Sequence, residues 1–118
     1  MLPAAHRLTD PTSFRAVVRS GRRAASRTLV VHTLVHPGEP GSGPQVGFVV
    51  SRAVGNAVTR NRVQRRLRHL VREQLDSLPA SATLVIRALP PAASAGSTEL
   101  RDDLVRCLRR ATREVPAS

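Results

Sequence analysis

The residues best suited to chemistry in this chain are the arginines of GNAVTRNRVQRRLRHLVRE, which covers positions 55–73. A guanidinium group carries a fixed positive charge and a planar set of donors that match carboxylates and phosphates. No aspartate or glutamate occurs from position 40 to position 72, so these arginines have no acidic partner nearby in the sequence. This spacing favours the binding of a polyanion.

A helix over about 57–76 would divide these residues between two faces, at roughly 100° per residue. The inner face would hold Val63, Leu67, Leu70, Val71 and Gln74. We call the opposite side the cationic face; its members are Arg62, Arg65, Arg68, His69 and Arg72. Solvated helix faces usually mix charge signs, and cations are unfavourable at the positive N-terminal end of a helix. The sequence therefore predicts a nucleic-acid-binding helix.

The start of this helix fits the same interpretation. Gly55 suits a sharp turn out of a preceding strand, and Asn56 is a favoured N-cap residue. Arg60 and Arg62 then lie near backbone N–H groups that lack partners, an arrangement that attracts an oxyanion. Asn61 is placed to contact a phosphate, a 2′-hydroxyl or a base edge, with a plain surface role as the alternative.

The composition of the whole chain agrees with a polyanionic partner. Its 118 residues are enough for one domain, 1–118, with a modest core. All 19 basic residues are arginine, and the formal net charge is +11. A charge imbalance of this size raises self-repulsion unless a polyanion is bound.

Other classes of function receive no support from the sequence. A single cysteine, Cys107, cannot form an internal disulfide, and no segment has the length and apolarity of a membrane span. The four histidines show no metal-ligand spacing with one another or with Cys107, and no carboxylate pair stands out. We therefore expect a cytoplasmic binding protein with no catalytic residue and no metal site of its own.

The remaining segments predict a small α/β fold. Asp10 and Pro11 favour the start of a first helix that Gly21 ends. The β-branched runs 27–35 and 45–51 predict two strands joined as a long hairpin, and 82–88 predicts a further strand. A last helix is expected from Ser97 or Thr98, with an apolar stripe formed by Leu100, Leu104, Cys107, Leu108 and Ala111.

The segment 51–73 resembles the RNR signature of the bacterial ribonuclease P protein family, in which Gly-Asn-Ala-Val and Arg-Asn-Arg precede a basic helix. The similarity extends to RLTDPTSFRAVVRSGRR, LVVHTL, VGFVVS and TLVIRA, and so covers nearly the whole chain. It implies an α-β sandwich of order α-β-β-(β)-α-β-α. It also implies a left-handed β-α-β crossover around the RNR helix, although about 98% of such crossovers are right-handed.

The resemblance also implies a function. Proteins of this family join a catalytic RNA, and the complex removes the 5′ leader of precursor tRNA with Mg²⁺ held mainly by the RNA and the substrate. No membrane and no further protein partner are implied. The matching RNA-binding positions are Arg52, Asn56, Arg60, Asn61, Arg62, Arg65, Arg66 and Arg68.

A cleft for the leader is implied between the first helix and the sheet. Its matching positions are Phe14, Val18 and His32, with Leu8 and Val30 as neighbours. The family often has aromatic residues at all three positions, and only Phe14 is aromatic here. Gln64 stands where many relatives carry a basic residue. Phe14 as a core residue and His32 as a buried hydrogen-bonded residue are the structural alternatives.

Two other functions remain open at this level. A ribosomal-type RNA-binding protein would also place a basic helix on a small sheet. A helix-turn-helix DNA-binding protein would need a helix directly before the basic one, where 45–51 predicts a strand.

Overall fold

A computed structural model describes residues 11–35 and 43–112. Asp10 and Leu8, together with most of the connector at 36–44, lie outside the described residues. The elements follow the predicted order and fold class. They are α1 (Pro11–Ser20), β1 (Arg22–Ala25), β2 (Leu29–Val35), β3 (Gln45–Val49), α2 (Ala57–Gln74), the short 3₁₀ helix η2 (Leu75–Ser77), β4 (Ala82–Ala88), the 3₁₀ helix η3 (Pro90–Ala93) and α3 (Ser97–Thr112).

The four strands form one sheet of order β1-β2-β4-β3. β4 pairs with β2 antiparallel and with β3 parallel, so it separates the two strands that we predicted to form a hairpin. The hairpin prediction is wrong. β4 takes the central place because its side chains are buried on both faces of the sheet. Leu84 and Ile86 are buried on one face, and Val85 is buried on the other.

The edge strand β1 was missed as a separate element by the sequence pattern. Its residues, Arg-Arg-Ala-Ala, include no β-branched or aromatic side chain, so local propensity gives no signal. It forms because the chain turns back at residues 26–28 and pairs antiparallel with β2, from Arg22 opposite Thr33 to Ala25 opposite Val30.

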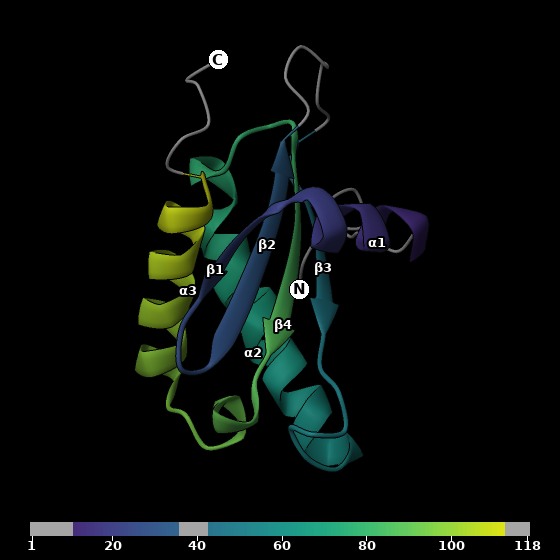
Figure 1. Cartoon of the computed structure of the whole chain (residues 1–118). Coiled ribbons are helices and arrows are strands. Elements are labelled where there is room, and N and C mark those ends of the chain that lie inside the picture. Colours follow the sequence, from purple (N-terminus) through teal and green to yellow (C-terminus); the bar gives the residue numbers. More distant parts are fainter. Residues whose placement is uncertain (1–10, 36–42, 113–118) are drawn as a thin grey trace.

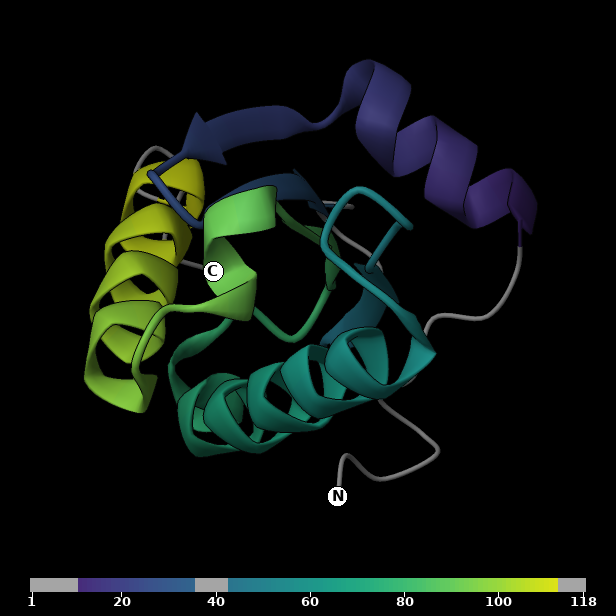
Figure 2. The same cartoon turned by 90° about the horizontal axis from the view of Figure 1, so that it is seen from below.

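The two sheet faces are covered unequally (Figures 1 and 2). One face carries large apolar side chains, including Leu29, Val31, Leu84 and Ile86, and packs against α2 and α3 in the main core. α1 lies over part of the other face, where its Val17 is buried against Val85 in a smaller cluster. The predicted apolar stripes of the last two helices are confirmed as buried; Asp103 joins the stripe of α3, where it accepts a hydrogen bond from the Thr28 hydroxyl.

The crossover from β3 through α2 to β4 is left-handed, as the resemblance implied. In Figure 1, β3 and β4 both run downward with β4 to the left of β3, and Figure 2 places α2 behind the sheet, on the side away from α1. With the strands turned to point upward, the connection runs behind the sheet and to the right, which is the left-handed sense. α2 lies on this face because the large apolar residues of β3 and β4 point there.

Candidate nucleic-acid interface

The basic helix α2 begins with the geometry that Gly55 and Asn56 predict. Gly55 has φ of +156°, a value that residues with a side chain rarely adopt. The Asn56 side-chain oxygen Oδ1 accepts a hydrogen bond from the backbone N–H of Thr59 at 2.9 Å, so Asn56 is the N-cap. Because β3 and a turn precede α2, the helix that a helix-turn-helix protein requires is absent from the described residues.

Burial separates the two faces of α2 as expected. The inner residues Val63, Leu67 and Val71 are fully buried, and each contributes roughly 1.5–3 kcal/mol through removal from water. Of the cationic face, Arg62, Arg65, His69 and Arg72 are exposed and Arg68 is half-buried. The inner side therefore packs in the core and holds the helix in place, while most of the cationic face remains in contact with solvent.

Two of the predicted RNA-binding arginines also contact the protein itself. Arg62 donates to the carbonyl of Ala93 at 3.5 Å, and Arg66 donates to that of Ala95 at 3.3 Å. These contacts join α2 to the connection between β4 and α3. Arg66 is half-buried and Ala95 is buried, so Arg66 combines a structural contact with its charge.

The other predicted residues of this surface differ in how freely they reach solvent. Arg52, in the turn before α2, and Asn61 are both exposed. Arg60 is half-buried, and its Nε is buried without a hydrogen-bond partner in the described part of the chain. Arg60 lies seven residues before Leu67 and so shares its inward direction, which brings its stem toward the protein.

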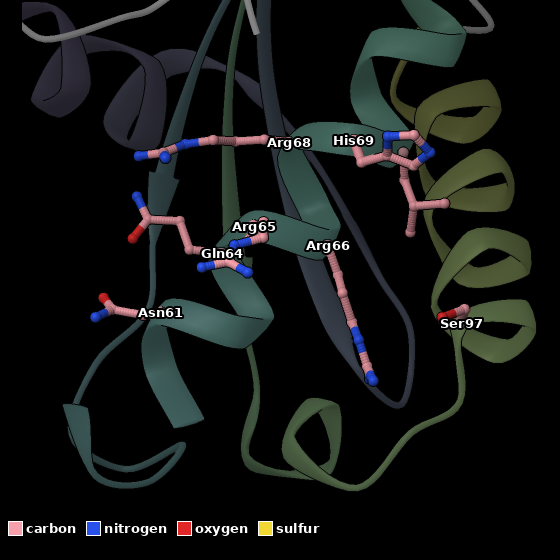
Figure 3. A pocket seen from close by; sticks show the side chains of 8 residues that line it. Asn61, Gln64, Arg65, Arg66, Arg68, His69 and Ser97 are labelled. Atoms are coloured by element: carbon pink, nitrogen blue, oxygen red, sulfur yellow. The ribbon is translucent and has the colours of Figure 1, made fainter. Parts of the chain in front are cut away.

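A groove runs along α2 beside the start of α3 (Figure 3). Figure 3 shows Arg66 extending toward the segment before α3, whereas Asn61, Gln64 and Arg68 extend from the other side of the helix. The lining residues are Asn61, Gln64, Arg65, Arg66, Arg68, His69, Leu70 and Ser97. Glu73, the acid of α2, lies 3.5 Å from His69 Nε2 and 3.7 Å from Arg101, at the end of the helix remote from the cap.

The residues predicted for the leader cleft lie on α1 and the sheet face beneath it. Phe14 is half-buried and packs in the cluster of Val17 and Val85. Its ring lies directly over Gly47, where an added Cβ would come within 2.1 Å of the ring carbon Cζ. Phe14 therefore has the structural role that was its alternative in the sequence. Its half exposure still leaves part of the side chain accessible to a ligand.

The other cleft positions have contrasting environments. Val18 is 44% exposed, whereas Val30 is buried. His32 is half-buried, and its Nδ1 is buried with no hydrogen-bond partner among residues 11–35 and 43–112. Burial lowers the pKa of His32, and the charges of Arg23 and Arg87 lower it further. These surroundings therefore favour the neutral form of the imidazole.

Arg23 and Arg87 belong to this surface but were not selected from the sequence. Arg23 lies directly opposite His32 on β1, and Arg87 lies two residues beyond Val85, the β4 partner of His32. Both arginines are exposed. A signal was available, because alternation along 82–88 places Arg87 on the face opposite Leu84 and Ile86. The position of Arg23 depends on β1, which local propensity did not predict.

Similar proteins are known over nearly the whole length of this chain. The family model described as Ribonuclease P matches residues 2–112. The chain belongs to the ribonuclease P protein family. The ribonuclease P protein component of Nocardioides sp. (strain ATCC BAA-499 / JS614) is 65% identical over 117 residues, which cover 98% of each chain. That of Corynebacterium diphtheriae is 48% identical over 118 residues, covering 97% of this chain and 99% of the relative.

Solved ribonuclease P proteins share the fold. A Staphylococcus aureus RNase P protein superposes with a TM-score of 0.78 at 24% identity, covering 90% of this chain and 94% of the other. The Thermotoga maritima protein gives a TM-score of 0.75 at 22% identity, covering 88% and 96%. As a ribonuclease P protein component, the chain belongs to a ribonucleoprotein nuclease of tRNA processing.

Among the described residues, no three histidine, cysteine, aspartate or glutamate side chains are arranged to hold a metal ion. In the same residues, no helix has the length and apolarity needed to cross a membrane.

Proposed function

We propose that this chain is the protein subunit of ribonuclease P and binds both the catalytic RNA and the 5′ leader of precursor tRNA. The observation that carries the proposal is the cationic face of α2, which is solvent-exposed and has no acid until Glu73. In this proposal, leader removal to give the mature tRNA 5′ end is catalysed by the RNA. No further protein partner is required, and the complex acts in the cytoplasm.

The first turn of α2 supplies the donors for RNA phosphates. The Asn56 cap occupies the N–H of Thr59, and the N–H of Arg60 bonds to the Asn56 carbonyl, as in any helix. The N–H groups of Ala57 and Val58 have no intrahelical acceptor, so they and the positive helix end favour an anion. Arg52, Arg60 and the cationic face extend this attraction along the helix.

The residues on the other side of the molecule are proposed to hold the leader. Phe14 offers the part of its ring that Gly47 and Val17 leave uncovered, Val18 offers an exposed apolar side chain, and neutral His32 offers a flat imidazole. Bases of single-stranded RNA stack on such groups with little dependence on sequence. The protein thus positions the substrate while the RNA reacts.

Mg²⁺ enters this proposal as an ion of the RNA and the substrate, where it would supply charge neutralisation and an activated water. Among the described residues, no three histidine, cysteine, aspartate or glutamate side chains are grouped in a way that would hold it. The part of this protein is to bring substrate and RNA together, and we assign no step of the reaction to one of its side chains.

Binding to a bacterial ribonuclease P RNA tests the function. We expect the protein to bind this RNA in preference to ribosomal RNA and duplex DNA at the same salt concentration, and to promote cleavage at the leader junction. Preferential binding to ribosomal RNA or to duplex DNA would refute the proposal in favour of one of the two alternatives.

The leader cleft is tested with a Phe14→Ala, His32→Ala double variant in the reconstituted complex. Loss of two stacking groups, at about 1–3 kcal/mol each, should reduce the preference for precursor over mature tRNA at least tenfold. A precursor with a single leader nucleotide serves as the insensitive control. Because Phe14 packs against Val17 and Val85, circular dichroism must first establish that the variant is folded. A folded variant that still prefers long leaders as wild type does would exclude this site.

A further inference from the structure

One basic surface of the molecule lies away from α2. The sheet face that meets α1 is formed by alternate residues of each strand, and one row of paired residues crosses it: Arg23, His32, Val85 and Gly47. α1 covers the β3 end of this row, because Phe14 lies over Gly47 and Val17 packs against Val85. β1, which carries Arg23, lies beside α1 and not beneath it (Figure 2), and Arg23 is exposed, whereas His32 on the neighbouring strand is half-buried.

The charged side chains of this surface are all arginines. None of the four strands and no position of α1 carries an aspartate or glutamate. The side chains of Arg23 and Arg87 are exposed and form no hydrogen bond or ion pair with the described residues. On a merely solvated sheet face, opposite charges normally stand across from one another because like charges on neighbouring strands are destabilising.

The geometry suits an extended anion. Arg23 and Arg87 stand on β1 and β4, on either side of β2, and are offset by two residues along the strands. Two strand spacings and this offset place their Cα atoms roughly 12 Å apart. His32 lies on β2, the strand between them, and its surroundings favour the uncharged imidazole. A flat uncharged ring between two guanidinium groups matches a nucleotide chain, in which a base lies between phosphates.

We propose that Arg23 and Arg87 bind two phosphates of the precursor leader on either side of the nucleotide that contacts His32. This inference rests on the proposed function and adds two residues to it. It also gives a physical reason for the weakly aromatic cleft of this chain. Charge-assisted contacts to the leader backbone would replace stacking energy that Val18 and His32 supply less well than aromatic rings do.

The test compares two double variants of equal charge in the complex with ribonuclease P RNA. Arg23→Gln, Arg87→Gln removes the proposed contacts, and Arg101→Gln, Arg109→Gln removes two exposed arginines of α3. Glutamine keeps most of each side-chain stem, so both proteins should fold, and thermal unfolding checks this. Affinity is measured over a series of salt concentrations for precursors with a long leader and with a leader of one nucleotide.

We expect the Arg23→Gln, Arg87→Gln variant to lose about tenfold or more in affinity for the long-leader precursor, since each charge-assisted contact accounts for a factor of that order. Its salt slope should fall by up to about 1.4, from about 0.7 for each single-strand phosphate. Affinity for the one-nucleotide precursor and for the RNA subunit should stay at the wild-type value. The α3 variant should keep the wild-type preference for long leaders.

The possible results separate this inference from the proposed function. If wild type prefers long leaders and the Arg23→Gln, Arg87→Gln variant does so equally, the arginine pair is excluded while leader binding stands. Equal losses for long and short leaders, or weaker binding to the RNA subunit alone, would assign the arginines to another contact and overturn the inference. A wild-type complex without any preference for long leaders would overturn both.

Discussion

Arg65 and Arg66 are neighbours in sequence that the structure places in different environments. Arg65 is exposed and makes no hydrogen bond or ion pair within the described residues, whereas Arg66 is half-buried and donates to the carbonyl of buried Ala95. Arg65→Ala and Arg66→Ala each remove one positive charge from the same helix. We expect the two variants to lose RNA affinity in similar ways and to differ in stability.

The size of the stability difference follows from the contact of Arg66. A hydrogen bond to a charged group contributes about 1.5–3 kcal/mol when well formed. The distance of 3.3 Å and the partial exposure of Arg66 reduce this to roughly 1 kcal/mol. For a chain of this length, that free energy lowers the midpoint of thermal unfolding by about 4 °C. Arg65→Ala should change the free energy of unfolding by less than about 0.5 kcal/mol.

RNA binding supplies the second measurement. Each variant should lower the slope of log affinity against log salt by up to about 0.9 if its arginine neutralises one phosphate of a duplex region. Thermal unfolding followed by circular dichroism, together with filter binding to the RNA subunit over several salt concentrations, gives both quantities. An Arg65→Ala protein with unchanged affinity and unchanged slope would contradict the RNA role. Equal melting temperatures for the two variants would contradict the structural role of Arg66.

Three further predictions follow from single contacts. The contribution of His32 to the free energy of unfolding should be greatest above about pH 6.5 and fall as the pH drops from there through its lowered pKa, because the unfolded chain then binds a proton that the folded protein resists. In the His32→Gln variant, the free energy of unfolding measured with urea should change less over this pH range. Gly47→Ala should destabilise the fold by about 1–3 kcal/mol, since its Cβ would overlap the ring of Phe14, and restored stability in a Gly47→Ala, Phe14→Leu double variant would identify the clash. Asn56→Ala should lower the free energy of unfolding by about 1 kcal/mol, because the N–H of Thr59 loses its cap, whereas Asn56→Asp should retain the cap. Equal melting temperatures for wild type and both variants would rule out the cap.

The sequence determined the features that depend on local order. The period of Val63, Leu67, Leu70 and Val71 predicts both the helix and its buried side, because spacing along one helix fixes which residues share a face. Asn56 predicts the cap for the same reason, since donor and acceptor are three residues apart. The resemblance added the left-handed crossover, against the general preference for right-handed ones.

Tertiary structure decided what depends on pairing between distant segments. β4 lies between β2 and β3 because its two apolar faces require a central place, a choice made by the whole core and not by the β2–β3 connection. The same packing brings Arg66 within hydrogen-bonding distance of the Ala95 carbonyl, whereas Arg65 forms no hydrogen bond or ion pair with the described residues. It also places Arg23 and Arg87 on either side of His32, because only the register of β1, β2 and β4 brings these three residues together.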